Sequence, residues 1–481
     1  MSRPRETAFC YALFGIMLVL ATANLRTTPR GSMAKWALLI SLLLTVAGAS
    51  QAKDWGSLLG RREAELAQCV LVMFCAGQVV HFLASGVGSQ AKHGVDFSAY
   101  YLAGKALQER PTEGLYDLPM FADGRMDLNT EDSPGTRWHA LAQREHVPFA
   151  APYIYPPFLA GFVAPLAQLP FAQALFAWNL LTTVLTLAGV LLSFAVAGVR
   201  ADGELALIAG VGLFSFFPFL NNLFFGQMGG VILFLFAAGV WFLSRRWIWL
   251  SALCFAVATL IKLTPAIVVP LLLLHRYWRW LAAYMAWCTG LLLLSVWMVG
   301  AHAYMEFWHM VLPAMGCGSA VWENTTVVSW VQQFLMGSSP FSSAPSHAIP
   351  AYACSASKAV ALVLYVVFLF QCWRRRRDLS VEASVVAVAL LGLAVSPISW
   401  WHHYTIALLP LIYLWWETPD GIGRRCLAAL GLLVGTNVVG LAGELVGSGV
   451  RLALGIVVPL LTAAAAFIAI SVRQNFDDAR V

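Results

Sequence analysis

Long apolar runs alternate with short polar connections along most of the chain. Twelve runs are long enough, or nearly long enough, to cross a bilayer, for which a helix needs about 20 apolar residues. The runs at 264–275 and 405–416 have only 12 residues each and are the weakest of the set. The pattern predicts membrane-spanning helices at residues 66–88, 171–197, 204–220, 226–244, 247–262, 264–275, 281–300, 357–373, 381–397, 405–416, 426–443 and 450–472.

Two polar stretches, residues 89–150 and 301–356, interrupt this series and are predicted to be loops on the outer side of the membrane. A third segment, from Tyr153 to Leu169, is apolar but contains three prolines. Proline removes a backbone donor and breaks a helix, so a segment of this kind at membrane depth needs shelter from lipid. We expect a broken helix that lies at the outer face or dips into it without crossing.

Composition and charge give the same class of protein. Of 481 residues, 60% are apolar and only 11% are charged, against about 25% charged in an average soluble domain, and the mean hydropathy is +0.73. This balance excludes a disordered chain, a nucleic-acid-binding arm and an ordinary cytosolic enzyme. With the spans above, 16 Lys and Arg fall in cytoplasmic loops and three in or beside the short outer connections and the 301–356 loop, as the positive-inside rule requires.

Unusual polar residues gather at one side of the predicted bundle. With this orientation they all lie at the outer membrane face, where ionisable groups near hydrocarbon are costly and mark functional sites. The candidates are Asp96, Tyr153, Tyr155, Asn221, Asn222, Gln227, Lys262, Glu323, Asn324, His402 and His403.

A carboxylate, a lysine, histidines and amides at one interface suit a reaction between a lipid-borne phosphate ester and a hydroxyl. Lys262 and a histidine would neutralise the phosphate, and a carboxylate would take the hydroxyl proton as general base. No spacing of acidic or histidine residues demands a metal, and no cofactor is expected. Each residue alone has a structural explanation: Asp96 as a helix N-cap, Lys262 as a side chain that snorkels, and the histidines as interfacial anchors. Their convergence favours function.

Six motifs occur in an order that resembles glycosyltransferase family 87. They are DFSAYYLAGKAL, LYDLP, YIYPPFLAGFVAPLAQLPF, FFGQ, IKLTP and SPISWWHHY, and they fall between about residues 66 and 420. The family contains GT-C-fold integral-membrane enzymes, typified by polyprenyl-phosphomannose-dependent mannosyltransferases. The resemblance implies an all-α polytopic membrane protein, a bundle of about 12–14 transmembrane helices with a large first extracytoplasmic loop that bears amphipathic helices.

The resemblance also implies roles for particular residues. The family's catalytic aspartate corresponds to Asp96, its tyrosine-proline-proline segment to Tyr155–Pro157, and its lysine before Thr-Pro to Lys262. The family's histidine turn corresponds to Ser396–His403. Where this chain has Asn324-Thr325-Thr326, family members often have Asn-Gln-Ser, so only the asparagine is retained.

The resulting hypothesis is a metal-independent, inverting sugar transfer, with mannose the leading choice of sugar. Asp96 deprotonates an acceptor hydroxyl, which attacks the anomeric carbon of a polyprenyl-phosphate sugar. Lys262 with His402 or His403 holds the leaving phosphate, and Tyr100, Tyr101 and Tyr155 shape the sugar pocket; Asn221, Gln227 and Asn324 are further candidates for donor binding. The partners expected are this lipid donor, a glycan or glycolipid acceptor and membrane lipids, with no nucleic acid. The site would face outward from the inner (plasma) membrane.

Two alternatives of another class remain at this point. A secondary transporter would favour inverted repeats and polar residues near the bilayer midplane, whereas the polar cluster lies at one face and no repeat is visible. A flippase for lipid-linked sugars would need a deep cationic cavity, which the apolar midsections of the predicted helices do not offer.

We divide the chain into three parts. Residues 1–65 form an N-terminal extension whose apolar runs, 8–24 and 36–50, make a helical hairpin; the charge pattern does not determine how this hairpin is placed in the membrane. Residues 66–420 form the catalytic membrane domain, with 89–170 as the extracytoplasmic loop and re-entrant segment and 301–356 as a second outer loop. Residues 421–481 add a transmembrane pair and a cytoplasmic tail. Cys317 and Cys354, both in the second outer loop, are candidates for a disulfide in an oxidising compartment.

Overall fold

The computed structural model describes residues 66–67, 70, 93–109, 115–116, 136–320, 324–337, 349–418, 422–436 and 448–469. Within these ranges the secondary structure is entirely helical, which confirms the predicted all-α fold. The predicted hairpin at 8–50, most of the predicted span 66–88, and Glu323 lie outside the described residues.

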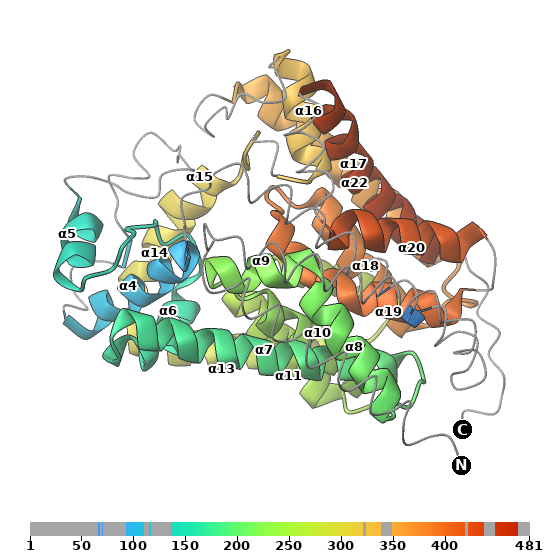
Figure 1. The fold of residues 1–481 in the computed structure, drawn as a ribbon, viewed down its shortest axis with the longest axis horizontal. Coiled ribbons are helices and arrows are strands. Elements are labelled where there is room, and N and C mark those ends of the chain that lie inside the picture. The colour runs from blue at the N-terminus through green and yellow to red at the C-terminus, as the bar shows by residue number, and fades with distance from the viewer. Residues whose placement is uncertain are drawn as a thin grey trace, which may run out of the picture.

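Short helices gather at one end of the molecule (Figure 1). They are α4 (Val95–Glu109), α5 (Arg137–Arg144), α6 (Pro157–Val163), η3 (Leu166–Gln168) and α14 (Ala301–Glu306). An ion pair of 2.8 Å between Lys105 and Glu145 ties α4 to the end of α5. Helix α6 begins at a proline, which suits a first helical turn, and ends at Val163, just before Pro165. The Tyr153–Leu169 segment is therefore a broken helix, as predicted.

Of the described helices, three are long and apolar enough to cross a membrane. They are α7 (Phe171–Val196), α13 (Trp278–Val299) and α17 (Ala351–Arg374), and 33% or less of the apolar window of each is buried inside the protein. The exposed apolar surface fits contact with lipid. The run predicted at 204–220 is a pair of helices, α8 (Gly203–Ser215) and α9 (Phe217–Phe225), which meet at 61° and count as a fourth span if taken together.

The other helices of the described chain are not counted as single spans. The remaining apolar runs give α10 (Gly229–Ser244), α11 (Ile248–Ile261), η4 (Thr264–Ile267), α12 (Val268–Leu274), α18 (Val381–Val395), η7 (Trp401–Ala407), α19 (Leu408–Glu417), α20 (Ile422–Gly435) and α22 (Ser448–Ala469). The second outer region contains a π-helical segment, η5 (Phe307–Val311), followed by α15 (Leu312–Met315) and α16 (Val327–Met336).

Helices α7 and α10 pack closely because glycines face the contact. A Cβ atom on Gly230 of α10 would lie 2.2 Å from the Thr186 hydroxyl oxygen and 2.6 Å from the Thr182 carbonyl oxygen of α7. A Cβ on Gly189 of α7 would lie 3.0 Å from the side chain of Leu233. Small residues at such contacts let helix backbones approach in a membrane. This packing holds α10, whose N-terminus begins just after Gln227, in a fixed position.

Helix α9 is short because both of its ends are determined by sequence. Pro218 lies in its first turn, and Gly226 ends it with φ +70°, in the left-handed region that glycine adopts without strain. A Cβ on Gly226 would lie 2.6 Å from Cβ of Phe97. From α7, the Trp178 indole nitrogen donates to the Gly226 carbonyl at 2.8 Å. The turn after α9 is therefore fixed against both α4 and α7.

We expect Gly226→Ala to destabilise the protein by about 2–4 kcal/mol, since alanine would be strained at this φ and would collide with Phe97. The measurement is the thermal unfolding midpoint of the purified protein in detergent. Gly203→Ala is the matched control, because a Cβ there meets no atom within 4 Å, and its midpoint should be unchanged or slightly raised. Equal midpoints for the two variants would contradict this account of the turn.

Candidate active site

One side-chain amide joins three predicted residues from distant parts of the sequence. The nitrogen of Gln227 donates to the Asp96 carboxylate at 2.9 Å and to the Tyr155 hydroxyl at 3.1 Å. Its oxygen accepts from the Tyr100 hydroxyl at 2.7 Å. Gln227, Tyr100 and Tyr155 are buried, whereas Asp96 is half-buried. We call these four residues the Asp96 group; in it the amide fixes the carboxylate beside two phenols.

The helix start places Asp96 in this group. Gly94 has φ +81°, and its N–H donates to the Phe224 carbonyl of α9 at 2.8 Å. Helix α4 then begins at Val95, so Asp96 lies in the first turn, where the helix dipole favours a negative charge. The helix start expected at Asp96 is therefore present, and the contact of its carboxylate with Gln227 is a further finding of the structure.

The two tyrosines of the Asp96 group remain neutral phenols. Burial, and then the negative charge of Asp96, raise the pKa of Tyr155. Burial is also the main cause that raises the pKa of Tyr100, with further contributions from Tyr155 and Asp96. Within this group the phenols thus offer hydrogen bonds, and Asp96 supplies the carboxylate.

A second group brings Lys262 to the histidine turn. Helix α11 ends at Ile261, and Lys262 is extended (φ −152°) just before η4, which carries Pro265 in its first turn. The Lys262 Nζ atom lies 2.5 Å from Nε2 of His403, and Nδ1 of His403 accepts the Trp400 N–H at 3.0 Å. The His402 ring lies 4.4 Å from the His403 ring, centre to centre. We call Lys262, His402 and His403 the Lys262 group.

The two histidines are buried beside the positive charge of Lys262. Burial, and then the positive charge of Lys262, lower the pKa of His402, and the same causes lower the pKa of His403. Neither ring nitrogen of His402 has a hydrogen-bond partner within the described chain, although both are buried. Unsatisfied buried groups of this kind are costly, and an entering anion would relieve the cost.

A hollow in the protein surface lies beside the Lys262 group. It is lined by Lys262 and His403 together with the polar residues Thr264, Ser396 and Ser399. The Ser399 hydroxyl is buried and has no hydrogen-bond partner within the described residues. Ser399 was expected at the outer face as the first residue of the run Ser399–His403, but no separate role was predicted for its hydroxyl, because a serine in a loop carries no charge signal.

The segment from Asn222 to Gly229 connects the two groups. Gln227 in its middle binds Asp96, while the Phe225 ring packs against the His402 ring at 5.9 Å. A Cβ on Gly229 would lie 3.1 Å from the His402 carbonyl oxygen. The Asp96 carboxylate is close enough to Lys262 for their charges to interact. The structure therefore brings the predicted aspartate, lysine and histidines to one region.

Of the predicted residues that the structure describes, five lie outside both groups: Tyr101, Tyr153, Asn221, Asn222 and Asn324. The Tyr153 hydroxyl donates to the Pro156 carbonyl at 2.7 Å. The Tyr101 hydroxyl donates to the Leu169 carbonyl at 2.9 Å, and its ring packs on Phe171. Asn221 is half-buried on α9, whereas the next residue, Asn222, is fully buried and accepts the Gly229 N–H at 2.7 Å. The Asn324 amide binds backbone atoms of the outer loop and of the histidine turn.

The described residues contain no cluster of three metal-ligating side chains. The site offers two chemical features: a carboxylate held beside phenols, and a cationic group beside buried polar atoms that have no hydrogen-bond partner within the described residues. This pairing suits a general base facing an anion site.

The chain belongs to glycosyltransferase family 87, whose family model matches residues 153–397, just over half of the chain. It is similar to two polyprenol-phosphate-mannose-dependent alpha-(1-2)-phosphatidylinositol pentamannoside mannosyltransferases. The one from Mycobacterium tuberculosis is 28% identical over 299 residues, or 62% of this chain and 65% of the relative. The one from Mycolicibacterium smegmatis is 27% identical over 298 residues, or 62% and 68%. No solved structure matches the chain.

The matched family region contains Tyr155, Gln227, Lys262 and Asn324, so it covers both the amide of the Asp96 group and the lysine of the Lys262 group. Asp96 precedes the region, and the two histidines follow its end. The family resemblance expected from the sequence motifs is confirmed.

Proposed function

We propose that this protein is an integral-membrane glycosyltransferase that moves a sugar from a polyprenyl-phosphate donor to a hydroxyl of a glycan or lipid acceptor. The observation that carries the proposal is that one short segment, Asn222 to Gly229, holds the Asp96 carboxylate through Gln227 and packs against His402 beside Lys262. A base and a cation in one region suit a transfer in which a proton leaves one reactant and a phosphate leaves the other. Membership of glycosyltransferase family 87 supports the same reaction class.

The donor phosphate would bind at the Lys262 group. A sugar phosphodiester carries one negative charge, which Lys262 would meet by charge-assisted hydrogen bonds. The unpartnered nitrogens of His402 and the Ser399 hydroxyl would supply further hydrogen bonds at the same place. Because these groups are buried, the phosphate would be bound in a medium of low dielectric, where their charges and dipoles act strongly.

In the transfer step the acceptor hydroxyl oxygen attacks the anomeric carbon, and the proton of the hydroxyl passes to Asp96. The bond between the anomeric carbon and the phosphate oxygen breaks, and its electron pair stays on the phosphate, which gains a negative charge beside Lys262. Because the base and the leaving group act on opposite sides of the sugar, the anomeric configuration is inverted. General base catalysis of this kind contributes about 10²–10⁴-fold in rate.

The finer assignments follow from the relatives and from the charge pattern. The relatives' names specify polyprenol-phosphate-mannose as donor and a phosphatidylinositol-linked mannoside as acceptor. Mannose is therefore the sugar we propose, with a glycan or glycolipid as acceptor. The distribution of Lys and Arg supports a site on the extracytoplasmic side of the inner membrane. The family assignment does not favour the transporter or the flippase considered above.

The test is a transfer assay on membranes from cells that express the full chain. Polyprenyl-phosphate mannose, glucose and arabinofuranose are supplied in turn, each with the sugar radiolabelled, and label is followed into lipid and glycan fractions. We expect transfer from polyprenyl-phosphate mannose and much less from the other two. Label that moves only from a nucleotide sugar would contradict the proposed donor class.

A second carboxylate beside Asp96 should shift the pH dependence of transfer. In Gln227→Glu the new carboxylate faces Asp96, and a like charge disfavours ionisation, which raises the pKa of Asp96. The base is active only when ionised, so activity should be lost at a higher pH as the pH falls. We expect the acidic limb of the kcat/KM profile to move upward by about one unit or more.

The matched control for this experiment is Gln108→Glu. It makes the same chemical change on α4, the helix that carries Asp96, at an exposed side chain that donates to the Ala164 carbonyl. Its profile should coincide with that of the wild type. A profile that is unmoved in Gln227→Glu, with the protein still folded, would remove Asp96 from the role of base.

A further inference from the structure

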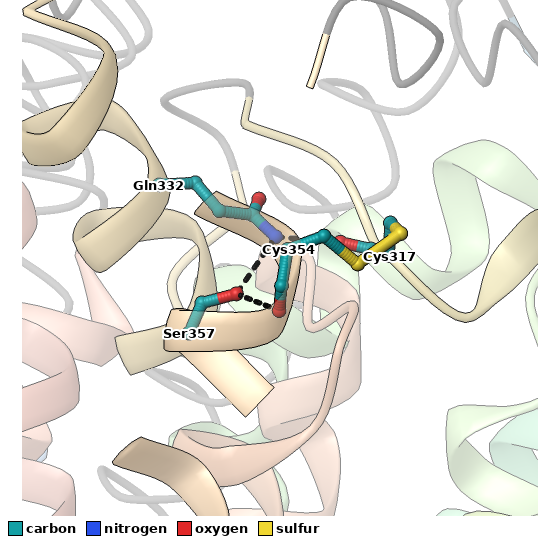
Figure 2. Close-up of a disulfide and its surroundings, with 4 residues drawn as sticks. All are labelled: Cys317, Gln332, Cys354 and Ser357. Atoms are coloured by element: carbon teal, nitrogen blue, oxygen red, sulfur yellow. Dashed lines mark hydrogen bonds between the residues drawn. A yellow bond between two sulfur atoms is a disulfide. The ribbon is translucent and has the colours of Figure 1, made fainter. Parts of the chain in front are cut away.

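A disulfide lies at the base of the second outer loop (Figure 2). Cys317, just after α15, is bonded to Cys354 in the first turn of α17, with 5.3 Å between their Cα atoms; the pairing considered from sequence is thus confirmed. Gln332 of α16 donates to the Cys317 carbonyl at 2.7 Å and to the Ser357 hydroxyl at 3.1 Å. The Ser357 hydroxyl donates in turn to the Cys354 carbonyl at 3.0 Å. The disulfide is therefore anchored to two helices.

The residues after Cys317 run directly against the backbone that leads to the histidines. Gly318 has φ +72°, and a Cβ there would lie 2.3 Å from the Pro397 carbonyl oxygen, so only glycine fits. The Asn324 amide nitrogen donates to the carbonyls of Ser319 at 2.7 Å and Pro397 at 2.9 Å. Its oxygen accepts the Ser399 N–H at 2.8 Å. One buried amide thus joins the loop to the start of the histidine turn.

Thr325 and Tyr404 extend this contact to the far side of the turn. The Thr325 N–H and hydroxyl both donate to the Ser399 carbonyl, at 2.9 and 2.8 Å. The Tyr404 hydroxyl donates to the Thr325 carbonyl at 3.2 Å. The loop therefore binds the chain before and after His402 and His403. We call Cys317, Cys354, Asn324 and Thr325 the loop clamp.

These contacts change the interpretation of Asn324. The sequence suggested a residue that binds the donor, but the amide is 3% exposed and all of its hydrogen bonds described here go to backbone atoms. Such an amide acts on the shape of the turn. Because His403 contacts Lys262 and both line the hollow, the shape of the turn determines where the imidazole lies relative to the lysine.

We propose that the loop clamp positions His402 and His403 for the donor phosphate, with Asn324 as a positioning residue and the Cys317–Cys354 disulfide as its anchor. The assignment of phosphate as the ligand rests on the proposed function; the positioning itself does not. It follows that an oxidising compartment is needed for full affinity, because reduction frees the start of the loop.

The first measurement is the affinity for farnesyl phosphate, a short polyprenyl phosphate, in detergent. Asn324→Asp keeps an acceptor for the Ser399 N–H but loses both donated bonds, and we expect it to weaken binding at least tenfold. If Asn324 acts through the histidines, the same substitution in a His403→Ala background should cost less than twofold, because coupled residues are not additive. The acceptor KM should not change in Asn324→Asp.

The disulfide is tested in the same assay. Cys317→Ser combined with Cys354→Ser should weaken farnesyl phosphate binding about three- to tenfold, and reductant should do the same to the wild type. Cys288→Ser is the matched control, since Cys288 is a free, half-buried cysteine on α13, and its affinity should match that of the wild type with and without reductant.

The second measurement does not depend on the ligand. Diethyl pyrocarbonate modifies accessible imidazoles, and mass spectrometry locates the adducts. His402 and His403 should be protected in the wild type and reactive in Asn324→Asp and in the double cysteine variant, with His302, 74% exposed, as the internal reference in every sample.

The two measurements separate the possible failures. Histidines that become reactive in a protein whose wild type binds no farnesyl phosphate would uphold the clamp and overturn the proposed function. The clamp would be overturned if the histidines stayed protected in the variants and the affinity for farnesyl phosphate were unchanged. It would also be overturned if the histidines stayed protected and the effects of Asn324→Asp and His403→Ala on that affinity multiplied.

Discussion

Asp96→Asn is expected to abolish sugar transfer while leaving the protein folded and able to bind the donor. Asparagine has nearly the same size and can still accept the hydrogen bond from Gln227, but it cannot take a proton. The loss should therefore fall on kcat and reach about 10³-fold or more, within the range ascribed to general base catalysis. Transfer of radiolabelled mannose and binding of farnesyl phosphate, measured on the same preparation, separate the two effects.

The matched control is Asp378→Asn, the same change at an exposed aspartate after α17. It should retain wild-type turnover and wild-type binding. If Asp96→Asn transferred sugar at a near-normal rate, Asp96 would be only a helix-terminal residue. If it lost farnesyl phosphate binding as well as turnover, its role would be structural.

Lys262→Met should have the second largest effect, and of a different kind. Methionine fills the space of the aliphatic stem but removes the charge, so the donor phosphate would be left without its cation. Removing one partner of a buried charge pair costs about 2–5 kcal/mol, which corresponds to roughly 30-fold or more in affinity. Farnesyl phosphate binding should fall by that factor, and the donor KM should rise with it.

Lys358→Met is the control for this change, because Lys358 is an exposed lysine on α17 that lies beside Gly316 in the second outer loop. Its affinity for farnesyl phosphate should equal that of the wild type. Unchanged affinity in Lys262→Met, or an equal loss in both variants, would contradict a specific phosphate site at Lys262.

The long apolar runs were sufficient to predict most of the helices. The run at 171–197 is α7, the run at 247–262 is α11, and the proline-rich segment 153–169 is broken. The apolar run at 204–220 did not reveal the 61° bend between α8 and α9. In a continuous apolar sequence, a proline in the first turn of a new helix cannot be told from a proline inside a single helix. Helix ends depend on such local backbone breaks more than on hydropathy.

The composition of the site was more predictable than its orientation. The order of polar motifs at one face brought Asp96 and Lys262 together in the prediction. Adjacent residues on a helix point about 100° apart, however, and a sequence does not indicate which of two buried neighbours faces the site. Tyr100 binds Gln227 while Tyr101 binds the Leu169 carbonyl, and Asn222 is buried where Asn221 was expected to act. Contacts between residues far apart in the sequence decide the orientation of the two tyrosines, since Tyr100 and Gln227 are 127 residues apart and Tyr101 and Leu169 are 68 residues apart.

The role of Asn324 could not be predicted from the sequence either, because it depends on contacts with residues far away in the chain. An asparagine at a membrane face suggests a ligand contact, and only the fold reveals that Pro397 and Ser399 lie beside it.

The central claim is that the base and the phosphate site act on one sugar, and an experimental structure with a polyprenyl-phosphate sugar bound tests it most directly. We predict phosphate oxygens within hydrogen-bonding distance, about 2.7–3.2 Å, of Lys262 Nζ and of the histidine turn, with the anomeric carbon between the phosphate and Asp96. A phosphate bound away from Lys262, or a sugar whose anomeric carbon faces away from Asp96, would contradict the account.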